Sequence, residues 1–125
     1  MARVLVVDDD ETVRRLLQRT LTGAGHDAQI AAGPNEALEI CQGDKSFDVI
    51  ICDVMMPGMD GHVLTQHIAI HCPRSRVLHI SGYDPGCDGC PYTTKCPVIA
   101  KPFVHGELIA AVDLALENPP RELRT

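Results

Sequence analysis

Five side chains that could do chemistry stand at, or directly after, the ends of short apolar runs. Three are the carboxylates of Asp8, Asp9 and Asp53, and the other two are Ser81 and Lys101. Carboxylates brought together repel one another unless a cation lies among them, and oxygen ligands of this kind favour Mg²⁺. A carboxylate can also accept a phosphoryl group as an acyl phosphate, which a lysine can pair with and a serine hydroxyl can hydrogen-bond. The residue types therefore indicate phosphorylation of an aspartate in a Mg²⁺ site.

These side chains can share one site only if the apolar runs before them are neighbouring parallel strands. Short β-branched runs bounded by turn residues are typical of strands buried on both faces. Five strands are expected: Arg3 to Val7, Asp27 to Ala31, Phe47 to Cys52, Arg76 to Ile80 and Val98 to Ala100. Strands that alternate with helices form βαβ units, and open parallel sheets bind ligands outside the carboxyl ends of their strands. The pattern predicts an α/β fold with one such crevice.

Four helices are expected around this sheet. The first has an apolar stripe at three- and four-residue spacing, made of Val13, Leu16, Leu17 and Leu21, and ends at Gly23 and Gly25. The second opens at Gly33 and Pro34 and carries Ala37, Leu38 and Cys41. The third covers His62 to His71, and the last covers Val104 to Glu117 with Leu108, Ile109, Val112 and Leu116 inward. Between Asp84 and Pro97, three Pro and two Gly give poor helix propensity.

The length and composition of the chain limit the classes of protein to which it can belong. The chain has 125 residues and is 45% hydrophobic, which predicts one domain with its own core and excludes intrinsic disorder. We expect residues 1–118 to form this domain and residues 119–125 a flexible tail. A net charge of −6 and 3% aromatic residues argue against nucleic-acid binding. No apolar run is long enough to span a membrane and no signal peptide is evident, so we expect a cytoplasmic protein.

Four sequence runs, in order, resemble those of the response-regulator receiver domain of two-component signalling. They are VLVVDDDE, DVIICDVMMPGMDG, HISGY and AKPF, and the resemblance extends from about Arg3 to Glu117. It implies a flavodoxin-like (βα)5 three-layer sandwich, with a parallel five-stranded sheet in the order 2-1-3-4-5. The fourth helix of that fold would be shortened or replaced by a loop.

The resemblance also implies a function. The chain would be the phosphoryl-accepting receiver module of a phosphorelay, with phosphorylation switching its conformation. Its partners would be a histidine kinase or phosphotransfer protein and an unknown downstream protein. It would not be an enzyme, beyond catalysing its own phosphoryl transfer and slow autodephosphorylation.

Residue by residue, Asp53 matches the phosphoacceptor of the family, and Asp8 and Asp9 match the acidic pair that holds Mg²⁺. Met55 matches the position that lends its backbone carbonyl to the metal. Ser81 matches the switch hydroxyl.

Lys101 matches the phosphate-pairing lysine, and its bond to Pro102 is similar to one that is cis in the family. The family often has an aromatic switch residue three positions before this lysine. Here that position is Val98, so the usual coupling between hydroxyl and ring is in question.

Three of the six cysteines lie together in a stretch rich in Gly and Pro. Cys87 and Cys90 have the two-residue spacing of a zinc knuckle, and Cys96 could be a third ligand. Candidates for a fourth ligand are Cys72, His79 and His105. A Zn²⁺ or other soft-metal site, a disulfide and unmodified thiols all remain open. The alternative function is therefore a metal- or redox-sensing receiver-like protein.

Other polar residues have plainer interpretations. Asp10 is expected to cap the first helix, and Cys41, Cys52 and Cys72 are expected to be buried in the core. A remote alternative reads Asp8-x-Asp10-x-Thr12 as the nucleophile motif of a haloacid-dehalogenase-like phosphohydrolase. That interpretation lacks a later acidic pair and gives Asp53 no role.

Overall fold

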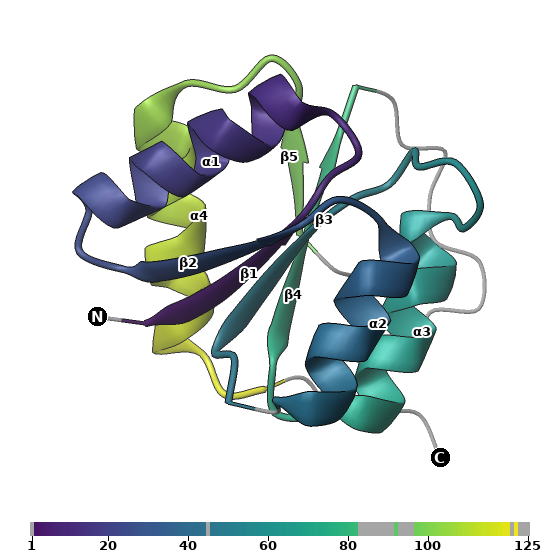
Figure 1. Cartoon of the computed structure of the whole chain (residues 1–125). Helices are drawn as coiled ribbons and strands as arrows, with labels where there is room; N and C mark the ends of the chain where they lie inside the picture. The colour runs from purple at the N-terminus through teal and green to yellow at the C-terminus, as the bar shows by residue number, and fades with distance from the viewer. Residues whose placement is uncertain (1, 45, 83–91, 93–96, 121, 123–125) are drawn as a thin grey trace.

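Five parallel strands form one sheet in the order β2-β1-β3-β4-β5 in the computed structural model (Figure 1). The structure describes residues 2–44, 46–82, 92, 97–120 and 122. The strands are β1 (Arg3–Val7), β2 (Asp27–Ala31), β3 (Val49–Asp53), β4 (Arg76–Ser81) and β5 (Val98–Ala100). The expected strand order is confirmed. Because β1 and β3 are parallel neighbours, their carboxyl ends lie at one edge of the sheet, and the strand order reverses between them.

Four helices cover the two faces of the sheet within the described residues. They are α1 (Glu11–Gly23), α2 (Pro34–Gly43), α3 (Gly61–His71) and α4 (His105–Glu117). Figure 1 shows α1 and α4 on one face and α2 and α3 on the other. The core is accordingly split into two apolar layers, and strand residues alternate between them. The arrangement is the expected three-layer sandwich.

The elements differ from the sequence-based expectation in small ways that have physical reasons. Strand β3 begins two residues later than expected, because Phe47 instead turns its ring into the layer between the sheet and α2 and α3. In α1, Leu16 was expected in the buried stripe but is 48% exposed. Leu17, Thr20 and Leu21 form the buried face, and Leu16 lies one residue, about 100°, around the helix from Leu17.

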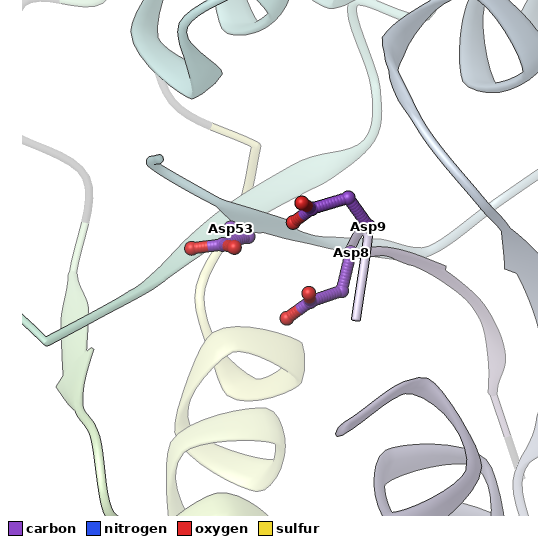
Figure 2. Close-up of side chains that lie close together, drawn as sticks. All are labelled: Asp8, Asp9 and Asp53. Atoms are coloured by element: carbon purple, nitrogen blue, oxygen red, sulfur yellow. The ribbon is translucent and has the colours of Figure 1, made fainter. Parts of the chain in front are cut away.

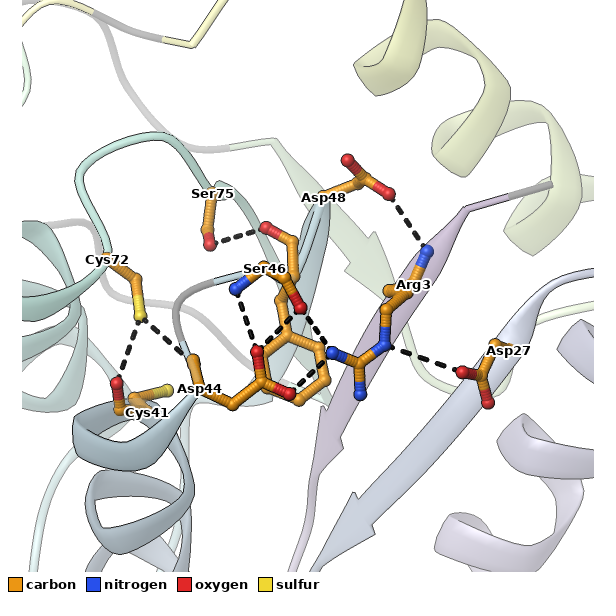
Figure 3. Close-up of polar contacts among 9 residues, drawn as sticks. Arg3, Asp27, Cys41, Asp44, Ser46, Asp48, Cys72 and Ser75 are labelled. Carbon is orange, nitrogen blue, oxygen red and sulfur yellow. Dashed lines mark hydrogen bonds and ion pairs between the residues drawn. The ribbon is translucent and has the colours of Figure 1, made fainter.

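The amino-terminal edge of the sheet is tied together by Arg3 (Figure 3). Its backbone N–H donates to Asp48 Oδ2 at 2.9 Å, and its guanidinium contacts Asp27, Asp44 and Ser46. Hydrogen bonds from Ser46 and Arg3 lower the pKa of Asp44 to about 2. One arginine thus joins β1 to β2 and to the segment before β3, at the end of the sheet opposite the expected site.

The same edge holds two of the expected core cysteines. Cys41 and Cys72 are buried where α2 and α3 end, and the Cys72 thiol donates to the Cys41 carbonyl at 3.5 Å (Figure 3). Nearby, Ser75 Oγ donates to the Phe47 carbonyl at 2.7 Å. The prediction that Cys41, Cys52 and Cys72 are core residues is confirmed, because each is at most 1% exposed.

Several expectations concern segments that the structure describes only in part. Helix α4 ends at Glu117, as expected. Most of the predicted flexible tail lies outside the described residues, as do Cys87, Cys90, Cys96 and the predicted loss of a helix before β5. Of the helices that are described, none combines the length and apolar character needed to cross a membrane.

Gly61 lets α3 begin against the backbone at the end of β3. Its N–H donates to the Val54 carbonyl at 2.8 Å. A Cβ atom at this position would lie 2.3 Å from the Asp53 carbonyl oxygen and 2.8 Å from Val54 Cα. Both neighbours are backbone atoms that cannot rotate away, so only glycine permits this approach.

We therefore expect Gly61→Ala to lower the free energy of unfolding by about 1–3 kcal/mol, the usual cost of overpacking. The matched control is Gly43→Ala at the end of α2, where a Cβ meets nothing within 4 Å. Urea unfolding of both variants checks this. The account of α3 docking is wrong if Gly61→Ala is as stable as Gly43→Ala.

Candidate functional site

The loop after β1 is fixed by its own hydrogen bonds. Asp10 caps α1, as predicted, because its Oδ1 accepts from the N–H groups of Thr12 and Val13. The Asp10 N–H in turn donates to Asp8 Oδ1 at 2.9 Å, and Arg14 donates to the Asp8 carbonyl at 2.9 Å. These contacts orient the Asp8 carboxylate toward the ends of the strands.

Asp53 is the last residue of β3 and is 5% exposed. Its Oδ1 accepts from the Met55 N–H at 3.3 Å. The backbone around it is held on both sides, because Val54 N–H donates to the Ile80 carbonyl at 3.0 Å and Gly61 donates to the Val54 carbonyl. The Asp53 carboxylate therefore has a defined position at the centre of the carboxyl edge.

Lys101 reaches this edge from the end of β5. Its backbone N–H donates to the Ser81 carbonyl at 2.9 Å, and its bond to Pro102 is cis, as expected. Its Nζ lies 3.2 Å from Asp8 Oδ2 and 3.4 Å from Asp53 Oδ2. One ammonium group thus bridges the two buried carboxylates.

Burial and charge act against each other in this cluster. Burial and the neighbouring Asp8 raise the pKa of Asp53, and the attraction of Lys101 offsets this only in part. Burial by itself lowers the pKa of Lys101, but Asp8 and Asp53 outweigh it, so the pKa of this lysine is raised. The lysine therefore stays protonated, and the site still lacks positive charge for its carboxylates.

The third carboxylate completes a set of metal ligands. Oxygen atoms of Asp8, Asp9 and Asp53 lie within 4.8 Å of one another, and Asp9 is exposed (Figure 2). Among the described residues this is the one group of three or more acidic, histidine or cysteine side chains close enough to share an ion. Carboxylate oxygens and an open, solvent-facing side suit Mg²⁺, which keeps several of its waters.

The structure thus brings together most of the residues that the sequence singled out. Ser81 ends β4 and is 3% exposed, one residue after Ile80, which pairs with Asp53 across the sheet. Met55 stands two residues after Asp53 in the chain and is 64% exposed. The three clustered cysteines cannot be placed, because they lie outside the described residues.

Sequence reasoning did not anticipate a buried polar group beside the site, although it names one member, His79, as a candidate metal ligand. His62 and Thr65 on α3 and His79 on β4 are at most 7% exposed. The rings of His62 and His79 meet edge to face with centroids 4.6 Å apart. The signal was present in the sequence, since a histidine inside the apolar run RVLHIS is unusual for a buried strand.

Comparison with known proteins identifies relatives of one kind. The family model described as "Response regulator receiver domain" matches residues 4–113. The transcriptional regulator NtrC of Klebsiella pneumoniae is 34% identical over 90% of this chain and 24% of its own length. The response regulator MprA of Mycolicibacterium vanbaalenii is 33% identical over 93% of this chain and 51% of its own length. The chain therefore spans about half, or less, of these relatives.

Solved structures of receiver domains and response regulators also resemble this chain. The receiver domain of the hybrid histidine kinase CckA has a TM-score of 0.80 and 31% identity, and the match covers 91% of this chain and 98% of that one. The response regulator TrrA of Thermotoga maritima, solved with Mg²⁺ and BeF, has a TM-score of 0.81 and 27% identity. That match covers 93% of this chain and all of TrrA.

The raised pKa of Asp53 predicts how stability depends on pH. Ionising this carboxyl lowers the free energy of unfolding, because its pKa is higher in the folded protein than in the unfolded chain. The stability that the protonated carboxyl provides is therefore fully present below the ordinary pKa of 3.8 and is lost as the pH rises through the raised pKa. Asp53→Asn should therefore be more stable than the parent at pH 7, and the gain should vanish below pH 3.8.

Thermal unfolding between pH 3 and pH 8 measures this difference, with Asp113→Asn on the exposed side of α4 as the matched control. A gain of the same size at every pH would mean that titration of Asp53 is not its cause.

Proposed function

The chain belongs to the response regulator receiver domain family, and from this premise we propose that Asp53 is its phosphoacceptor. Receiver domains are the phosphoryl-accepting modules of two-component signalling. The observation that carries the assignment to Asp53 is its place in the cluster. It is a buried carboxylate at the end of a central strand, between the acidic pair and a lysine.

The other residues have roles that follow from their positions. Asp8, Asp9 and Asp53, with the backbone carbonyl of Met55, would hold Mg²⁺, which supplies positive charge to the oxygens of the phosphoryl group in transfer. An oxygen of the ionised Asp53 carboxylate forms the new bond to phosphorus while the bond between phosphorus and its donor breaks. The donor departs with the electron pair of the broken bond, and the phosphoryl group brings the negative charge of its own oxygens into the site.

Lys101 and Ser81 would stabilise the product. The Lys101 ammonium already lies 3.4 Å from Asp53 Oδ2, and it can follow the charge onto the phosphoryl group. The Ser81 hydroxyl can donate a hydrogen bond to the same group. Because Val98 stands where the family often has an aromatic ring, we infer that the response reaches the surface without a ring swinging inward.

The partners follow from the same chemistry. We propose a histidine kinase or phosphotransfer protein as the phosphodonor and a protein as the downstream target, with no direct binding to nucleic acid at a net charge of −6. The chain would catalyse only its own phosphorylation and slow dephosphorylation. Its place of action would be the cytoplasm, where such donors are found.

The proposal predicts Mg²⁺-dependent uptake of one phosphoryl group from a small phosphodonor such as acetyl phosphate. Asp53→Asn should abolish uptake, and Lys101→Met should reduce it by one to two decades, the cost of about 1.5–3 kcal/mol for one charged hydrogen bond. Intact-protein mass spectrometry measures the product.

The control is Asp113→Asn, whose carboxylate lies on the exposed side of α4 and should be phosphorylated like the parent. Equal uptake by Asp53→Asn and the parent would show that another residue is the acceptor.

We further propose that Cys87, Cys90 and Cys96 bind Zn²⁺, with Cys72, His79 or His105 as the fourth ligand. The two-residue spacing between Cys87 and Cys90, which is that of a zinc knuckle, supports this proposal.

This proposal predicts about one Zn²⁺ per chain in protein purified without chelator, and its loss in the double variant Cys87→Ser with Cys90→Ser. Cys41→Ala is the control, because Cys41 is buried at the end of α2 and should leave the metal content unchanged. Metal analysis is combined with thiol counting in denaturant without reductant. Four reactive thiols of the six would indicate a disulfide instead, and six thiols with no metal would contradict both cross-links.

A further inference from the structure

A closed circuit of hydrogen bonds joins the end of β3, the first turn of α3 and strand β4. Two of its links are between backbone groups. Val54 N–H donates to the Ile80 carbonyl at 3.0 Å, and Gly61 N–H donates to the Val54 carbonyl at 2.8 Å. Val54 directly follows Asp53, so both links hold the backbone on which the proposed phosphoacceptor stands.

Two side-chain links close the circuit. Thr65 Oγ1 donates its one hydrogen to the Gly61 carbonyl at 2.8 Å, so in its 2.9 Å contact with His79 Nε2 the hydroxyl accepts and the ring donates. His79 is covalently joined to Ile80, whose carbonyl accepts from Val54. The path therefore runs from Val54 through Gly61, Thr65, His79 and Ile80 and back to Val54.

The side chains of the circuit are buried, which makes each side-chain link costly to break. Thr65 is fully buried and His79 is 1% exposed. A polar group left without its partner in such a place loses much more than the same group in water. The His62 ring packs edge-on against His79 and further restricts its orientation. A buried polar contact therefore joins α3 to β4 in addition to the apolar packing between them.

Two residues of the proposed reaction site, Asp53 and Ser81, lie directly beside residues of this circuit. The Asp53 carbonyl oxygen lies against Gly61, and Ser81 follows Ile80 on β4. We propose that Thr65 and His79 are positioning residues, which hold the phosphoacceptor and the Ser81 hydroxyl in register for phosphoryl transfer. This inference rests on the proposed function of Asp53 and adds two residues that do not touch the reacting atoms.

The experiment compares variants that open the circuit with variants that keep it. Thr65→Val removes the hydroxyl at nearly constant shape, and Thr65→Ser retains it. His79→Leu opens the circuit from the other side while Thr65 keeps its bond to Gly61, so it serves if Thr65→Val does not fold. Thr20→Val is the matched control, because Thr20 is a buried threonine of α1 on the opposite face of the sheet.

The readout is the rate of phosphoryl uptake from acetyl phosphate at saturating Mg²⁺, at a temperature where every variant is folded. Thr65→Val and His79→Leu should be about tenfold slower than the parent, since small displacements of reacting groups are costly. Thr65→Ser should recover most of the rate, and Thr20→Val should lose stability without losing rate.

Two outcomes overturn the inference, and they differ. If the parent takes up phosphate and Thr65→Val reacts as fast as Thr65→Ser, the circuit only stabilises the fold. If the parent takes up no phosphate, the proposed function of Asp53 is itself wrong and the positioning role falls with it.

Discussion

The burial of two carboxylates beside one lysine is the constraint on which the rest of this molecule depends. Asp8 and Asp53 are 1% and 5% exposed, and Lys101 Nζ lies within 3.4 Å of an oxygen of each. Burial, and then the charge of Asp8, raise the pKa of Asp53, and one lysine offsets this only in part. A divalent cation would supply the positive charge that the carboxylates still lack.

The fold supplies this arrangement from three separate strand ends. The strand order places β1 and β3 side by side, so that the acidic pair and the acceptor meet, and the cis bond after Lys101 lies where β5 ends. Helix α3 can start against the acceptor only because residue 61 is glycine. Backbone hydrogen bonds from Val54, Gly61 and Lys101 therefore hold the segments that carry the site.

Sequence reasoning could predict the elements that repeat a simple pattern. Strands β1, β2 and β5 lie where the apolar runs predicted them, and Asp10 caps α1 as its residue type indicated. The prediction was wrong for Leu16, because the apolar stripe of α1 is narrower than a list of its apolar residues implies. Periodicity ranks neighbouring helix positions only coarsely.

The polar circuit through Thr65 and His79 could not be predicted, for a physical reason. It depends on a side chain of α3 meeting a side chain of β4 at 2.9 Å, 14 positions apart in the chain. No local pattern encodes such a contact. The position of Lys101 is similar, since its distances to Asp8 and Asp53 follow from the order of the strands and not from spacing along the sequence.

The measurement that tests the central claim most directly identifies the phosphorylated residue chemically. Borohydride reduces an aspartyl phosphate to homoserine and leaves an unmodified carboxylate intact. After reaction with a phosphodonor and Mg²⁺, reduction and peptide mass spectrometry should find homoserine at position 53. Homoserine at Asp8 or Asp9 instead, or at no position in protein that has taken up phosphate, would contradict the account.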